Sequence, residues 1–148
     1  MELLIIVFLL GGLFLGWSLG ANDAANVFGT AVGTRMVQFK TAAIICSVFV
    51  ILGAIISGSG TTETLGKLGS INALPGAFAA CVAAGLSVYI MTKLGLPVST
   101  TQAIVGAIIG WNLYTGSSTN IQVLITILST WVLCPIIAGL IAMLFFVI

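Results

Sequence analysis

Residues 3–20 read LLIIVFLLGGLFLGWSLG, a run without a charged side chain. A helix needs about 20 apolar residues to cross the hydrocarbon core of a bilayer. Further apolar runs of similar length follow in this 148-residue chain, at residues 41–57, 75–92, 97–114 and 121–148. The sequence therefore predicts an all-α integral membrane protein with several spanning helices and no soluble domain.

The composition excludes an ordinary soluble domain. Apolar residues make up 60% of the chain. Charged residues make up 5%, against about 25% in soluble domains, and so few charges cannot cover the wet surface of a globule. The net charge of +1 without a basic cluster argues against a nucleic-acid partner. The absence of histidine and of any nucleophile–base pair argues against an enzyme.

The basic residues predict an orientation in the membrane. Arg35 and Lys40 flank the second apolar run at one end, and Lys93 ends the third run on the same side, two crossings later. Cytoplasmic connections are enriched in Lys and Arg. We therefore expect a multi-pass protein of the cell membrane with its N-terminus outside. The polar segment of residues 58–74 is then expected to be a solvated outer connection.

Glycine spacing predicts close helix packing. Small residues four positions apart lie on one helix face and allow a second backbone to approach closely. Three such sets occur among the 18 glycines, and we expect them to line helix contacts. These are Gly12, Gly16 and Gly20; Gly29 and Gly33; and Gly106 and Gly110.

The first polar interruption is GANDAAN at residues 20–26. Asp23 follows an apolar run and lies at membrane depth, where a carboxylate is costly. Asn22 and Asn26 are four residues apart, so the three side chains form a set of hard oxygen ligands that suits Na⁺ or a proton. We expect the helix to break here and to restart at Ala24 with Asp23 as its N-cap, as transporter helices do at ion sites. A purely structural cap is the alternative.

The second polar interruption is GLPVSTTQ at residues 95–102. Its proline disfavours helix at the preceding residue, so Ser99 or Thr100 is the predicted N-cap of a following helix. A helix N-terminus presents unpaired N–H groups and a partial positive charge, and Thr101 adds a third hydroxyl. The segment is a candidate oxyanion site. An ordinary capped span is the alternative.

Both interruptions resemble known motifs. Residues 20–30 (GANDAANVFGT) resemble the signature of the inorganic phosphate transporter family, and residues 97–106 (PVSTTQAIVG) resemble its second hallmark. The resemblance implies a secondary transporter that moves phosphate with Na⁺ or H⁺ and needs no cofactor. It also implies two halves of inverted topology, each with a broken helix and a re-entrant helical hairpin.

One copy of each motif is present, so residues 1–148 are expected to form a single transmembrane repeat. This repeat would be the first half of a longer transporter, or a half that pairs with itself or with another chain. Gln102 stands where many family members carry histidine. Because glutamine does not titrate, Na⁺ is favoured over H⁺ as the coupling ion.

The resemblance assigns both interruptions to the transport site. The residues expected to bind the coupling cation are Asn22, Asp23 and Asn26. The residues expected to bind phosphate are Asp23, Ser99, Thr100 and Thr101.

Cation-coupled phosphate symport by alternating access is the leading hypothesis, and three alternatives remain open. A sulfate or other oxyanion permease would share the fold, but phosphate can donate a hydrogen bond to Asp23, whereas sulfate cannot. A structural or assembly subunit would explain the glycine spacing but not a carboxylate at depth. A passive anion channel would give flux without a cation gradient.

Overall fold

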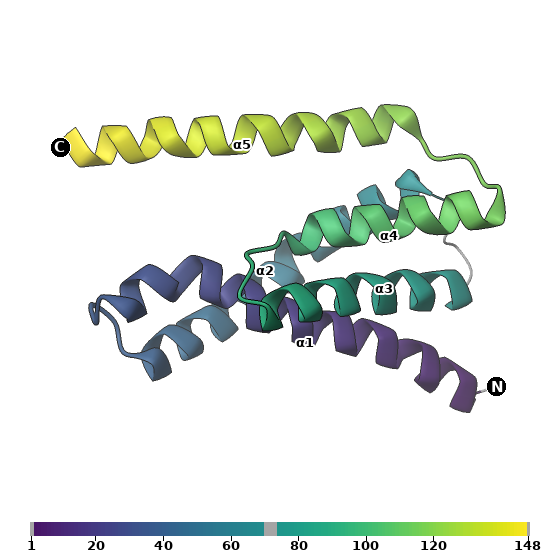
Figure 1. The fold of residues 1–148 in the computed structure, drawn as a ribbon, viewed down its shortest axis with the longest axis horizontal. Helices are drawn as coiled ribbons and strands as arrows, with labels where there is room; N and C mark the ends of the chain where they lie inside the picture. The colour runs from purple at the N-terminus through teal and green to yellow at the C-terminus, as the bar shows by residue number, and fades with distance from the viewer. Residues whose placement is uncertain (1, 70–73, 148) are drawn as a thin grey trace.

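The computed structural model describes residues 2–69 and 74–147, and this part is helical without a strand. Its helices, shown in Figure 1, are α1 (Glu2–Gly33), α2 (Phe39–Leu68), α3 (Leu74–Lys93), α4 (Thr100–Thr115) and α5 (Ile121–Val147). Among them, α1, α2, α3 and α5 are long and apolar enough to span a membrane. The prediction of an all-α, multi-pass integral membrane protein is confirmed.

The first helix is continuous. α1 runs for 32 residues through the segment 20–26, so the predicted break, with a restart at Ala24 and Asp23 as N-cap, is wrong. Three of the seven residues in this segment are alanine, the strongest helix former. The side chain of Asn22 bonds to another element and so does not compete for the backbone of α1.

The second helix is longer than predicted. α2 continues to Leu68, so the outer connection expected at residues 58–74 is wrong as far as residue 68. Residues 70–73 of this expected connection lie outside the described part of the chain, as do residues 1 and 148. The hydroxyls of Thr62 and Thr64 donate to the carbonyls of Gly58 and Gly60 in the preceding turn, at 3.0 and 2.9 Å. These two hydroxyls therefore find their partners within α2 itself.

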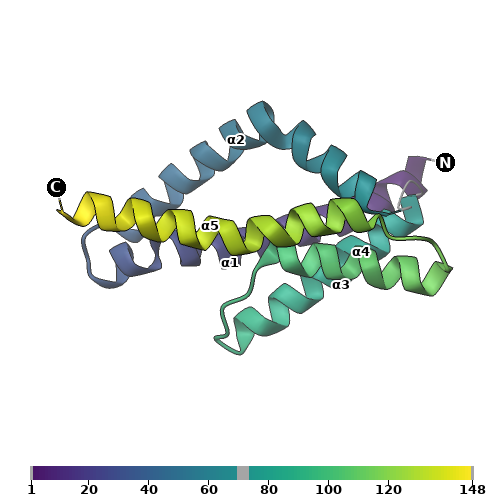
Figure 2. The same cartoon turned by 90° about the horizontal axis from the view of Figure 1, so that it is seen from above.

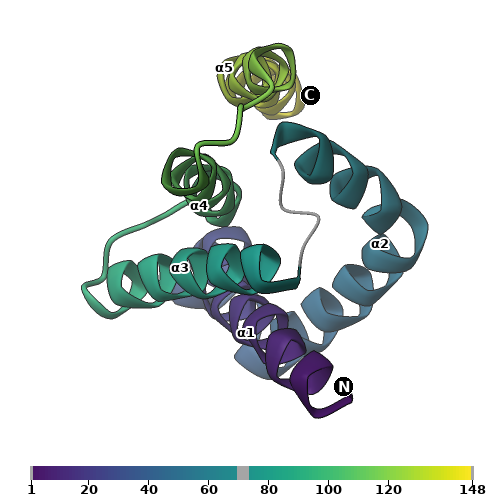
Figure 3. The same ribbon diagram turned by 90° about the vertical axis from the view of Figure 1, so that its right-hand side faces the viewer.

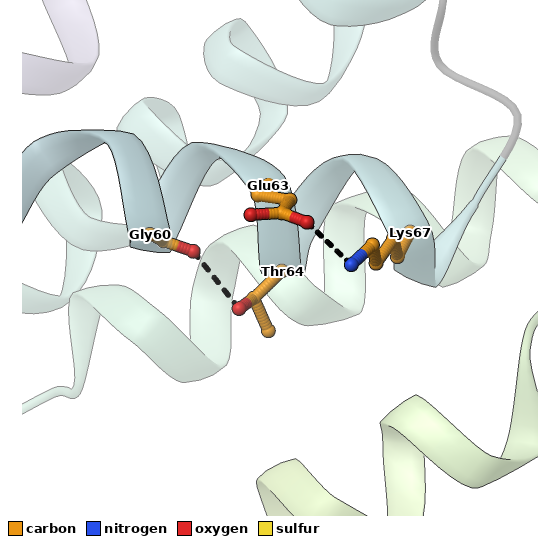
Figure 4. Close-up of polar contacts among 4 residues, drawn as sticks. All are labelled: Gly60, Glu63, Thr64 and Lys67. Carbon is orange, nitrogen blue, oxygen red and sulfur yellow. Dashed lines mark hydrogen bonds and ion pairs between the residues drawn. The ribbon is translucent and has the colours of Figure 1, made fainter.

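Two further features distinguish α2. Figure 2 shows the helix bent near its middle, and its central stretch carries SGSG at residues 57–60, a sequence typical of helix bends. Beyond the bend, Glu63 and Lys67 form an exposed ion pair one turn apart (Figure 4). These two charges offset one another near the end of the helix.

α3 and α4 form a helical hairpin closed by the turn of residues 94–99. The turn contacts Asn22 through Val98, and Thr100 at the start of α4 contacts Asp23. Asp23 lies about 15 Å before the end of α1 at a rise of about 1.5 Å per residue. Figures 1 and 2 agree that the turn stops short of the connection between α1 and α2. The predicted hairpin is confirmed, but the prediction that Lys93 shares an end with Arg35 and Lys40 is wrong.

An apolar cluster joins α2, α3, α4 and α5. α1 packs mainly on α3, and α3 packs on α4. Seen along the bundle in Figure 3, α4 lies between α3 and α5 while α2 arches along another side. Leu68 of α2 and Ile108 of α4 are fully buried in the cluster, with Ile127 of α5 beside them. This cluster packs the C-terminal end of α2 against the middle of α4.

The close helix contacts use glycines other than those predicted. A Cβ atom added to Gly85 would lie 2.7 Å from the Phe14 ring, one added to Gly11 would lie 2.7 Å from the Phe78 ring, and one added to Gly76 would lie 2.8 Å from Trp111 Nε1. The predicted glycines have no such neighbour within 4 Å in the described part of the chain. They are Gly12, Gly16, Gly20, Gly29, Gly33, Gly106 and Gly110. Their expected role in contacts within this chain is wrong. The four-residue spacing shows that these glycines share one side of a helix, but it does not show whether another helix packs on that side.

We expect Gly85→Ala to lower the apparent melting temperature of the detergent-solubilised protein. The added methyl group would collide with Phe14, and overpacking of this kind costs about 1–3 kcal/mol. Gly16→Ala is the matched control, because nothing within 4 Å would meet its Cβ and alanine favours helix. Equal losses in the two variants would contradict the observed α1–α3 packing.

Candidate functional site

The hairpin turn is bonded to the side of α1. Asn22 Nδ2 donates to the Val98 carbonyl oxygen at 2.7 Å and to Asp23 Oδ1 at 2.9 Å. Thr100 Oγ1 also donates to Asp23 Oδ1, at 3.0 Å. Asn22 and Thr100 are both buried. These bonds bring two segments more than 70 residues apart in sequence into one polar cluster.

The first turn of α4 presents hydrogen-bond donors to this cluster. The side chain of Ser99 accepts the N–H of Gln102 at 3.3 Å, so the predicted N-cap at Ser99 is confirmed. The first N–H groups of a helix have no partner within the helix, and they lie at its partially positive end. The start of α4 therefore offers Thr100 and Thr101 with both backbone N–H groups and hydroxyls.

A pocket of about 380 Å³ lies where α1 meets the start of α4. It combines one carboxylate, one amide, three hydroxyls and the helix start. Its lining residues are Asp23, Asn26, Pro97, Val98, Ser99, Thr100 and Thr101. The structure thus brings together all the predicted site residues except Asn22.

Asn22 lies behind the pocket. Its amide nitrogen holds Val98 and Asp23, and its amide oxygen faces Thr92 Oγ1 at 3.5 Å. Both polar atoms of the Asn22 side chain therefore bond to groups of the protein. These bonds make Asn22 a residue that links α1 to the hairpin. Sequence reasoning missed Thr92, because a threonine near the end of an apolar run carries no signal of its own.

The pocket presents both oxygen ligands and hydrogen-bond donors. Asp23 and Asn26 offer oxygen ligands of the kind that suits a hard cation. The hydroxyls and the start of α4 offer donors to an oxyanion without a lysine or arginine. Among the described residues, no group of three or more His, Cys, Asp and Glu could hold a metal ion. The oxygen ligands and donors that line the pocket are of the kinds that suit an alkali cation and an oxyanion.

Comparison with known proteins identifies the family. A sequence profile of the phosphate transporter family matches residues 19–148. The chain belongs to this family. Its members are transporters rather than enzymes, as the sequence predicts.

Several family members align along almost the whole chain. Two relatives carry the name "putative phosphate permease". The protein of Pyrococcus furiosus is 37% identical over 153 residues, which cover 97% of this chain and 37% of the relative. The protein of Methanocaldococcus jannaschii is 40% identical over 131 residues, which cover 88% of this chain and 42% of the relative.

A solved structure shares the fold. It is described as the sodium-dependent phosphate transporter, and it superposes with a TM-score of 0.85 at 35% identity. The match covers 99% of this chain and 38% of the solved chain. The chain thus spans well under half the length of the phosphate transporter family members that it matches.

Proposed function

We propose that the protein containing this chain carries inorganic phosphate across the cell membrane by Na⁺ symport with alternating access. The observation that supports this most directly is the pocket in which Asp23 of α1 meets the hydroxyl-bearing start of α4. The site lies part-way along membrane-spanning helices, where a carboxylate is rare unless it has a function. Family membership and the sodium-dependent structural relative support the same proposal.

Phosphate would bind at the first turn of α4. Its oxygens would accept hydrogen bonds from the N–H groups of the helix start and from the hydroxyls of Ser99 and Thr101. Both bonds that the described residues make to Asp23 reach Oδ1, so Oδ2 remains for the pocket. A monoprotonated phosphate can donate a hydrogen bond to this carboxylate, whereas sulfate carries no proton and cannot donate one. The site therefore favours phosphate over sulfate.

Na⁺ would bind between Asp23 and Asn26. Without a cation, the carboxylate would repel the phosphate in a medium of low dielectric constant. Bound Na⁺ would remove this repulsion, and phosphate would raise the affinity for Na⁺ by the same factor. Symport would follow from this reciprocal coupling, and the site needs no further cofactor.

The remaining parts of the proposal concern assembly and orientation. A second half of inverted topology, in the same chain or in another protomer, would complete the site. Arg35 lies in the connection between α1 and α2, and Lys40 lies in the first turn of α2, so we place this connection in the cytoplasm. The N-terminus would then lie outside.

Uptake of labelled phosphate into proteoliposomes tests the function. The full-length protein would be given an inward Na⁺ gradient, an inward proton gradient, or neither. We expect accumulation with the Na⁺ gradient alone, and little competition from an equal concentration of sulfate. Equal flux without a gradient would indicate a passive channel, and strong inhibition by sulfate would indicate a general oxyanion permease.

A further inference from the structure

The place where α1 passes into α2 presents both basic and apolar side chains at the surface. Figures 1 and 2 agree that it lies at one end of the bundle, beyond the turn between α3 and α4. Arg35 is exposed, and so is Lys40 in the first turn of α2. Between them in sequence, Met36 and Phe39 expose 81% and 74% of their surface. We call these four residues the α1–α2 tip.

The backbone of the tip is bonded to the end of α1. The N–H of Arg35 donates to the Val32 carbonyl at 3.0 Å, and the N–H of Val37 donates to the Ala31 carbonyl at 3.2 Å. Val37 is half-buried, whereas its neighbour Met36 faces outward. The exposed side chains therefore project from a turn whose direction is fixed by hydrogen bonds.

Arg35 has a backbone conformation that normally selects glycine. Its φ is 61°, in the left-handed region that costs stability for a residue with a Cβ atom. α3 and α4 end in a similar way, but there the residue with positive φ is a glycine, Gly95 or Gly116. In all three turns its N–H bonds to the carbonyl three residues earlier. An arginine at the strained position indicates a role for its side chain.

Two simpler roles do not account for this position. A cation near the C-terminus of α1 offsets the partial negative charge of the helix end, but a basic residue elsewhere in the last turn would do so without strain. An ion pair within the chain does not account for it either. Within residues 2–69 and 74–147, the ion pair that forms joins Glu63 and Lys67 at the opposite end of α2.

We propose that the α1–α2 tip binds the headgroup of an anionic phospholipid. The tip joins two helices that are long and apolar enough to span a membrane, so it lies at the membrane surface. The guanidinium of Arg35 can bond two oxygens of a lipid phosphate at once, and Lys40 adds a second positive charge. Met36 and Phe39 enter the boundary between headgroups and acyl chains. The inference does not depend on which ion the protein carries.

The thermal stability of the detergent-solubilised full-length protein tests this site. Short-chain phosphatidylglycerol is expected to raise the apparent melting temperature more than phosphatidylcholine does at the same concentration. Arg35→Gln and Lys40→Gln should each need about fivefold more phosphatidylglycerol for half of this effect, which corresponds to about 1 kcal/mol. Phe39→Ser should weaken the response to both lipids, because it removes apolar contact with the acyl chains.

Lys67→Gln is the matched control. It also removes one exposed positive charge from α2, but at the opposite end of the helix. We expect its response to phosphatidylglycerol to equal that of the wild type. Equal responses in the wild type and in a protein with both Arg35→Gln and Lys40→Gln would overturn the proposed lipid site.

Arg35→Gly separates a lipid contact from a role in folding. Glycine adopts a positive φ without strain, so the melting temperature without added lipid should not fall. The response to phosphatidylglycerol should nevertheless weaken as much as in Arg35→Gln. If Arg35→Gly lowered the melting temperature without lipid and kept the lipid response, Arg35 would serve the fold and not a lipid.

Inorganic phosphate separates the lipid site from the proposed transport site. It would bind beside Asp23, so any stabilisation by free phosphate should be the same in the wild type and in Arg35→Gln. A phosphate response that requires Arg35 would indicate a site for the free anion and overturn the lipid site. A lipid response that requires Arg35, in a protein that carries no phosphate, would support this inference and overturn the proposed function.

Discussion

Replacement of Asp23 by asparagine is expected to reduce Na⁺-driven phosphate uptake by at least about 100-fold. Asparagine has the same shape, and its amide oxygen can still accept the hydrogen bonds from Asn22 and Thr100. The substitution therefore removes the charge but keeps the contact between α1 and the hairpin. Loss of one partner of a charge pair at low dielectric costs about 3–5 kcal/mol, and about 1.4 kcal/mol corresponds to a factor of ten. Initial rates of labelled phosphate uptake under a Na⁺ gradient measure the effect.

Glu63→Gln is the control for Asp23→Asn. Glu63 is also acidic and also lies in a helix that is long and apolar enough to span a membrane. It is exposed, pairs with Lys67 (Figure 4) and does not line the pocket that contains Asp23. We expect its uptake to remain close to that of the wild type. Full Na⁺-driven uptake by a correctly inserted Asp23→Asn variant would refute the role of Asp23 in the transport site.

Replacement of Asn22 by leucine is expected to damage both stability and transport. Leucine fills a similar volume but cannot donate to the Val98 carbonyl or accept from Thr92. Val98 and Thr92 are half-buried, so each polar group left without its partner costs about 1 kcal/mol, the lower end of the range for buried groups. The hairpin turn should then separate from α1. We expect a lower apparent melting temperature and at least about a tenfold loss of uptake at saturating Na⁺.

Asn26→Ala provides the contrast. Asn26 is exposed and lines the pocket where α1 meets the start of α4. Loss of its side chain should weaken the response to Na⁺ and leave the melting temperature unchanged. The same pattern in Asn22→Leu would decide the role of Asn22. If the Asn22→Leu variant kept the wild-type melting temperature and only required more Na⁺ for uptake, Asn22 would be a cation ligand, as the sequence predicts. It would then not be a residue that links α1 to the hairpin.

The sequence alone determined the class of protein and the approximate places of its helices. Apolar runs too long for a core strand, with few charges, leave a bilayer as the only solvent that suits them. The N-cap at Ser99 was also predictable, because proline two residues earlier and a hydroxyl at the helix start act over a few residues. Local signals of this kind do not depend on what the helix packs against.

The polar stretches were harder to predict. GANDAAN and the serine- and threonine-rich stretch of α2 both suggested interruptions, yet both are helical. A polar side chain in a membrane can satisfy its hydrogen bonds by ending the helix, by bonding to its own helix, or by bonding to a neighbour. Thr64 uses its own helix, and Asn22 uses the hairpin turn. The choice depends on what lies alongside, which no window of sequence contains.

The packing of neighbouring helices also explains which glycines make close contacts and which of the predicted site residues line the pocket. Gly11 and Gly12 are neighbours in sequence, but only Gly11 faces α3 closely. Similarly, Asn22 and Asn26 lie one turn apart, but the first is enclosed by the hairpin while the second lines the pocket. The sequence determined which residue types were available for a phosphate and cation site. Only the tertiary structure decided which of them hold the helices together and which face the pocket, because a helix's rotation about its axis is set by packing against its neighbours.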